Sequence, residues 1–142
     1  MANVHKDFHG ALSYGLAFLE EKYGAEARTQ FLARLADTVY KPLADDLRVR
    51  GVVALREHWA RIFELEGGAI EMHEDGDTLV LHVHRCPAIT HMQEQGYRIA
   101  DHFCEHTRIV NEAVCRAAGY EATVDYDQAA GRCVQRFRRI AA

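Results

Sequence analysis

The first half of the chain carries apolar side chains at every third or fourth position, which is the spacing of amphipathic helices. This pattern predicts three helices, over residues 4–23, 25–40 and 52–66. Pro42 is expected to kink or end the second helix, and a short helical continuation over 43–49 stays open. The N-terminal part of the protein is therefore expected to be helical.

A strict alternation of apolar and polar side chains follows, which is the period of a β-strand. It predicts a hairpin with a type I′ turn at Asp75-Gly76 and with strands over 69–74 and 77–84. That turn places Met72 opposite Leu79, so that one face of the hairpin is apolar. The opposite face then carries the alternate positions, Glu71, His73, Val80, His82 and His84.

Three further elements are predicted after the first hairpin. They are a short helix or turn, a long helix and a second hairpin, over 88–95, over 99–118, and over 121–127 with 132–139. The chain is expected to form one α+β domain over residues 1–142, helical over 1–66 and hairpin–helix–hairpin over 67–142. Its N-terminal helices would pack on one side of a small, mostly antiparallel sheet of two hairpins, with the long helix between them.

Composition and charge narrow the function classes. The chain has 142 residues and a formal net charge of −4, so no basic field is available to neutralise nucleic-acid phosphates. We find neither the apolar core of a signal peptide nor an apolar run long enough to span a bilayer, and we expect a cytoplasmic protein with reduced thiols and no membrane partner. A small-molecule substrate is the expected partner, and homo-oligomer formation stays open.

Candidate chemistry concentrates between His82 and Thr107, where imidazoles and thiols cluster. Cys104 lies about one turn into the predicted 99–118 helix, where exposed amides can lower the pKa of a thiol and make it a nucleophile. The candidate bases are the helix histidines, His106 among them, and a strand histidine such as His84. The alternative reading of Cys104 is a buried, packed thiol.

Other side chains near Cys104 are candidates for binding a substrate. Arg108 with Asn111 can hold a carboxylate in a bidentate contact, although the pattern favours a surface ion pair for the arginine. Cys86 ends a strand before Pro87, a common position for a reactive group, or it is a core cysteine.

A second hypothesis is a metal- or cofactor-binding protein. His82 and His84 share one strand face, and His102 and His106 share one helix face, so two facing pairs with a cysteine would bind zinc or another transition metal. The cysteine spacing contains no C-x-x-C, which disfavours a zinc ribbon. A third hypothesis is a ligand-sensing domain without turnover.

The C-terminal half resembles the L-2-amino-thiazoline-4-carboxylic acid hydrolase-like family. The resemblance covers about residues 79–138 and is carried by Arg85-Cys86-Pro87, Gly96, Phe103-Cys104, Gly119, Gly131-Arg132-Cys133 and Phe137. It implies hydrolysis of a carbon–nitrogen bond in a small cyclic amidine or amide, the family's named substrate being a thiazoline carboxylate. We expect no cofactor under this hypothesis, the alternative being the zinc or other transition metal of the second hypothesis.

The family pattern and this chain differ at one position. Members typically carry an acidic residue three positions after the cysteine that matches Cys104, and Thr107 stands there in this chain, beside His106. The leading hypothesis is therefore a hydrolase with Cys104 as nucleophile and with His106 or His84 transferring protons. Cys86 is a further catalytic candidate, and the substrate-binding candidates are Cys133, Thr107, Arg108 and Asn111.

Overall fold

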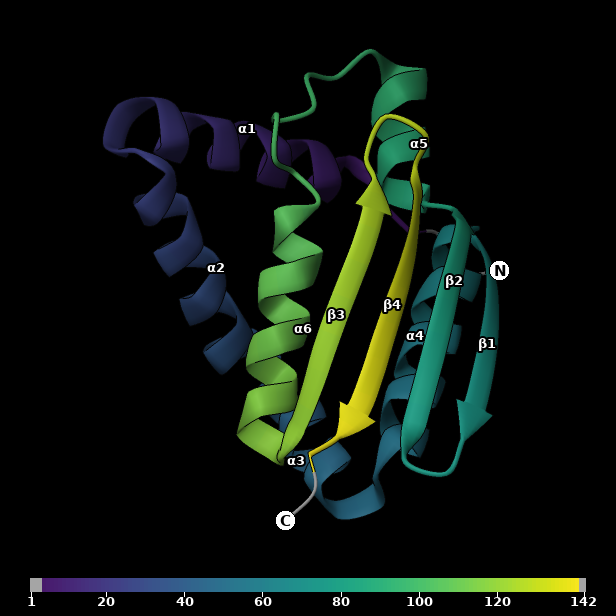
Figure 1. Ribbon diagram of the computed structural model, residues 1–142. Coiled ribbons are helices and arrows are strands. Elements are labelled where there is room, and N and C mark those ends of the chain that lie inside the picture. The colour runs from purple at the N-terminus through teal and green to yellow at the C-terminus, as the bar shows by residue number, and fades with distance from the viewer. Residues whose placement is uncertain (1–3, 141–142) are drawn as a thin grey trace.

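Residues 4–140, which the computed structural model describes, form six helices and four strands (Figure 1). In chain order these are α1 (Asp7–Tyr23), α2 (Ala25–Val39), α3 (Lys41–Arg50), α4 (Val52–Glu66), β1 (Ala69–Asp75), β2 (Thr78–Arg85), α5 (Pro87–Gln95), α6 (Glu105–Ala118), β3 (Tyr120–Asp127) and β4 (Arg132–Arg139). The predicted α+β class is confirmed. In this part of the chain no helix combines the length and the apolar character needed to cross a membrane.

The four strands make one antiparallel sheet in the order β1-β2-β4-β3. The last strand of the chain, β4, thus lies inside the sheet between β2 and β3, so that the second strands of the two hairpins are neighbours. Helices cover one face of the sheet, as Figure 1 shows. The opposite face is exposed to solvent and carries cross-strand ion pairs such as Arg136–Asp125 and Arg138–Glu121.

The turn of the first hairpin was predicted wrongly. The turn residues are Gly76 and Asp77, and Met72 pairs with Leu81 instead of Leu79. Gly76 has a φ of 59° and Asp77 has no positive φ, the pattern of a type II′ turn with glycine at the first central position. Because each pairing moves by two positions, every side chain stays on its predicted face, and the apolar face still points to the core.

The long helix also begins later than the predicted residue 99. The segment before α6 is held by tertiary contacts: the buried hydroxyl of Ser13 accepts a hydrogen bond from the amide of Ala100 (2.8 Å) and donates one to the carbonyl of Arg98 (2.7 Å). Phe103, in the same segment, is 1% exposed. These contacts satisfy backbone groups that an earlier helix would have used, so the helical spacing here reflects a packed loop.

The core consists of two clusters of buried apolar side chains. One lies between the sheet and the helices α3, α4 and α6, and includes Leu79 and Phe137. The other joins α1, α2, α5 and the loop before α6, and includes Leu16 and Phe103. Cys86 packs against both clusters. Helix α3 packs against both α4 and α6, and so connects these two helices at one end.

The loop before α6 depends on the Ser13 hydroxyl. Replacing Ser13 with alanine leaves a buried amide and a buried carbonyl without this partner, and we expect the free energy of unfolding to fall by about 1–3 kcal/mol. Urea denaturation measures this change. Thr29→Ala is the control, because its exposed hydroxyl bonds only within α2, and it should change stability by less than about 0.5 kcal/mol. Equal effects of the two substitutions would contradict the anchoring role of Ser13.

Candidate active site

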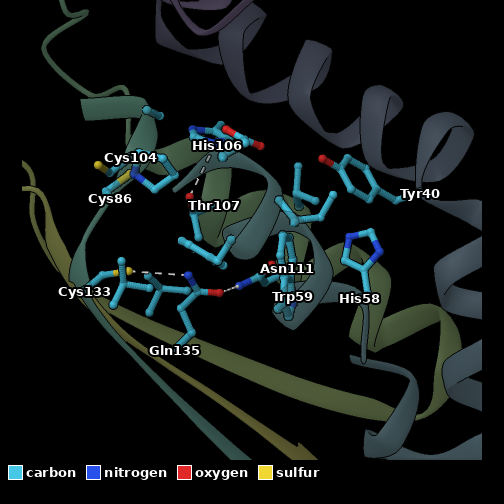
Figure 2. Close-up of a pocket in the computed structure, with 18 of the residues that line it drawn as sticks. Tyr40, His58, Trp59, Cys86, Cys104, His106, Thr107, Asn111, Cys133 and Gln135 are labelled. Atoms are coloured by element: carbon cyan, nitrogen blue, oxygen red, sulfur yellow. Dashed lines mark hydrogen bonds between the residues drawn. The ribbon is translucent and has the colours of Figure 1, made fainter. Parts of the chain in front are cut away.

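A cavity of about 650 Å³ is lined by α4 on one side, by α6 on the other and by strands of the sheet. This volume is within the range of about 300–1,000 Å³ that is typical of sites for small molecules. Most of its lining side chains are apolar, and the polar ones gather in a few places (Figure 2). The cavity is the candidate active site.

Three thiols from three parts of the chain line this cavity. Cys86 precedes α5, Cys104 precedes α6, and Cys133 lies on β4. Figure 2 shows them together at one end of the cavity. The fourth cysteine, Cys115, is 0% exposed and lies in the core. The predicted convergence of Cys86, Cys104 and Cys133 thus exists in the fold.

The three thiols are protonated at neutral pH, because burial raises each thiol pKa. The pKa of Cys104 rises to about 12 through burial and through the nearby Cys86 and Cys133. Burial also raises the pKa of Cys86, but the backbone amides of Ile89 and Ala88 at the start of α5 oppose the rise. Of the two, Cys86 therefore has the surroundings that better stabilise a thiolate.

Cys104 was expected one turn into a helix and instead precedes the first residue of α6. Its backbone amide donates a hydrogen bond to the side-chain oxygen of Gln128 (2.9 Å). Gln128 in turn donates to the carbonyl of Ala100 (2.9 Å). The turn between β3 and β4 thereby fixes the position of Cys104.

Cys133 has a polar neighbour that the sequence analysis missed. The buried side chain of Gln135 donates a hydrogen bond to the sulfur of Cys133 (3.4 Å), which opposes the rise that burial causes in the thiol pKa. Gln135 also accepts a hydrogen bond from the amide of Asn111 (2.8 Å). Asn111, 3% exposed, is therefore already engaged with the sheet and positions Gln135.

His106 reaches the cavity as a neutral imidazole. Burial lowers its pKa, and its Nδ1 lies 2.7 Å from the carbonyl oxygen of Phe103. A carbonyl only accepts, so Nδ1 carries the proton and Nε2 keeps a lone pair. Nε2 lies 3.5 Å from the hydroxyl of Thr107, which also lines the cavity. His106 is thus able to accept a proton.

A second imidazole, His9, lines the same cavity and was not predicted. Its Nε2 lies 2.5 Å from a carboxylate oxygen of Glu66, and the two side chains are only 11% and 10% exposed. Glu66 also lines the cavity and is close enough to Cys86 for its charge to raise the pKa of that thiol. The pair joins α1 to the end of α4 beside the thiols, and is arranged like a base held by a carboxylate.

Glycine at position 68 allows the end of α4 to approach the thiols. A Cβ atom on Gly68 would lie 2.6 Å from the ring of Phe63 and 2.9 Å from Pro87, closer than real contacts permit. Phe63 belongs to α4, and Pro87 follows Cys86. The missing side chain therefore lets Glu66 lie near Cys86.

Arg108 does not take the substrate-binding position predicted for it. Its guanidinium donates hydrogen bonds to Glu105 (2.8 and 2.9 Å) and to Glu112 (3.0 and 3.1 Å) on the same helix. The lining of the cavity does not include Arg108. Its charge is compensated within α6, and the ion-pair alternative describes what the structure shows.

The four histidines of the metal hypothesis are not brought together. His82 and His84 stack on the outer face of the sheet, 6.2 Å between ring centroids, and His102 is exposed before α6. His106 alone of the four lines the cavity. Among residues 4–140 no group of three or more histidine, cysteine or acidic side chains is arranged to hold a metal ion.

The other end of the cavity is formed by aromatic side chains. Tyr40 and His58 lie there with ring centroids 6.3 Å apart, and His58 contacts Trp59. Burial and the nearby Arg61 lower the pKa of His58. Trp59 also lines this end of the cavity.

Comparison with known proteins adds no assignment. No protein-family model matches the chain, and no curated protein matches it. Function is therefore inferred from the cavity itself.

The buried thiols should make the protein less stable at alkaline pH. A folded pKa of about 12 for Cys104 lies above the ordinary value of 9.0, so above pH 9.0 the unfolded chain binds fewer protons than the folded one. The stability that the protonated Cys104 thiol contributes is therefore fully present below pH 9.0 and is lost as pH rises toward 12. Urea denaturation between about pH 8 and pH 10.5 measures this slope. Cys104→Ala should reduce it, His84→Gln should not, and an unchanged slope in Cys104→Ala would contradict the assignment.

Proposed function

We propose that the protein hydrolyses a carbon–nitrogen bond of a small cyclic amidine or amide, with a cavity thiol as nucleophile and an imidazole as proton carrier. The observation that carries the proposal is the convergence of three thiols with His9 and His106 on one cavity of about 650 Å³. The resemblance to the thiazoline hydrolase-like family supports the choice of bond. Thiol chemistry requires reduced cysteines, which fits the cytoplasm.

Cys86 is the nucleophile that the surroundings favour. The amides of Ile89 and Ala88 oppose the rise in its thiol pKa, whereas all the influences on the pKa of Cys104 raise it. Cys86 also lies near the carboxylate of the His9–Glu66 pair. Cys104 and Cys133 then belong to the wall that surrounds the reacting carbon.

The reaction proceeds in two halves. The Cys86 thiol gives its proton to an imidazole, and the sulfur attacks the amidine or carbonyl carbon. The carbon–nitrogen bond breaks as the imidazolium returns the proton to the leaving nitrogen. Water, losing a proton to the same imidazole, then attacks the carbon, and the carbon–sulfur bond breaks to restore the protonated thiol. His9 and His106, which both line the cavity, are the candidate proton carriers.

A ligand-binding domain without turnover is the second candidate. It is favoured by the raised pKa of the cavity thiols, which keeps them protonated when the cavity is empty. Such a protein would be stabilised by a ligand and would release no product. Assays for turnover distinguish the two candidates.

Turnover should depend on Cys86 above the other cavity thiols. Hydrolysis of L-2-amino-thiazoline-4-carboxylate and of other five- and six-membered cyclic amidines and amides is followed by release of the product amine or thiol. Cys86→Ser should lower kcat/KM by at least about 10³-fold, because the nucleophile is lost. Cys115→Ala, which is outside the cavity, should retain activity. Full activity in Cys86→Ser would contradict this assignment, and no hydrolysis of any such compound by the intact protein would contradict the function.

The second test concerns the His9–Glu66 pair. If His9 carries the proton, His9→Gln should lower kcat by about 10²–10⁴-fold and remove one limb of the pH profile. His84→Gln is the matched control, because His84 is on the outer face of the sheet and 53% exposed. An unchanged pH profile in His9→Gln would assign proton transfer to His106.

A further inference from the structure

The cavity is elongated along α4. Its lining includes residues of that helix from Ala54 to Glu66. At a rise of about 1.5 Å per residue this interval measures about 18 Å. Figure 2 shows the thiols at one end and, at the other, the rings of Tyr40 and His58. The space therefore continues well past the groups that do the chemistry.

The chemistry of the wall changes along this length. Near Glu66 it offers thiols, imidazoles and a carboxylate, whereas near Ala54 it offers rings and aliphatic side chains, including Leu43 (8% exposed), Trp59 and Val39. The acidic residues at that end, Asp46 and Glu57, both form ion pairs with Arg50. A cationic ligand group would find little compensation there, because these carboxylates are already paired and the basic Arg61 also lines the cavity near His58.

A thiazoline carboxylate fits this cavity poorly as its only occupant. Such a molecule is short and anionic, and it would leave the far end empty. The arginine expected to hold its carboxylate, Arg108, is outside the cavity and paired with two acids. A longer and largely apolar ligand would fill the space that such a molecule leaves empty.

We propose that the ligand is an amphipathic molecule, with a polar reacting head against the thiols and an uncharged alkyl or aryl body lying along α4 toward Tyr40. The identity of the polar head rests on the proposed function, whereas the uncharged body is inferred from the cavity alone. Each buried methylene of such a body contributes about 0.8 kcal/mol, which is about fourfold in affinity.

Alkyl methanethiosulfonates of increasing length test, without requiring turnover, whether the cavity binds an alkyl chain. Each reagent transfers its alkylthio group to a cysteine, forming a mixed disulfide and releasing methanesulfinic acid. Rates are measured by mass spectrometry of the cysteine peptides and are divided by rates for glutathione. From methyl to hexyl we expect the normalised rate at Cys86 or Cys104 to rise at least about tenfold. A rate that is flat or falls with chain length would overturn the proposal.

Two substitutions test where the alkyl chain lies. Val39→Trp, at a position that lines the far end but is 61% exposed, should narrow that end and remove the length dependence while the methyl reagent reacts as before. His58→Trp narrows the same end from α4 and should act alike. Val49→Trp is the control, because Val49 is 83% exposed and outside the cavity, and it should keep the length dependence. An unchanged length dependence in both cavity variants would overturn the proposal.

The outcomes separate this inference from the proposed function. A length dependence together with no hydrolysis of any cyclic amidine or amide would contradict the function and leave the ligand shape intact. Hydrolysis of short substrates with no length dependence would contradict only the ligand shape.

Discussion

The pairing of β2 with β4 is the interaction on which the site depends. These strands belong to different hairpins, yet they are neighbours in the sheet, and Val83 pairs with Cys133. Just beyond that pair the amide of Cys86 donates a hydrogen bond to the carbonyl of Gly131 (2.8 Å). Two thiols that are far apart in the chain are thus placed at the same end of the sheet. The position of Cys104 follows from the same turn, through its bond to Gln128.

The shape of the cavity follows from how the helices lie on this sheet. Helix α6 packs chiefly against β3 and α2, whereas α4 lies over β1 and β2. Helix α3 connects the two at one end, and the His9–Glu66 pair lies at the other end near the thiols. The inner positions of the central strands, such as Val83 and Gln135, form the floor of the space between the helices. An elongated cavity with thiols at one end is the result.

Most of the fold could be predicted from periodicity, because each face of a helix or strand is a local property. The turn at Gly76 and the start of α6 could not, since the first depends on which of two turn types closes the hairpin and the second on a hydroxyl 87 positions away. The pairing of Arg108 was visible in the sequence, because Glu105 and Glu112 stand three and four positions from it. The alternation of the first hairpin already placed His84 on the polar face.

The thiol end of the candidate site could be anticipated from the clustering of cysteines, but the proposed base could not. His9 and Glu66 are 57 positions apart and have no local motif, so only the fold brings them together. In the proposed function this pair would remove the proton from a thiol that burial keeps protonated. A thiol whose pKa is raised by an apolar wall is unreactive at rest, but once deprotonated it is a stronger nucleophile than an acidic thiol. In the proposed function a buried Cys86 needs a base, and the histidine that a buried carboxylate holds, His9, is the proposed one.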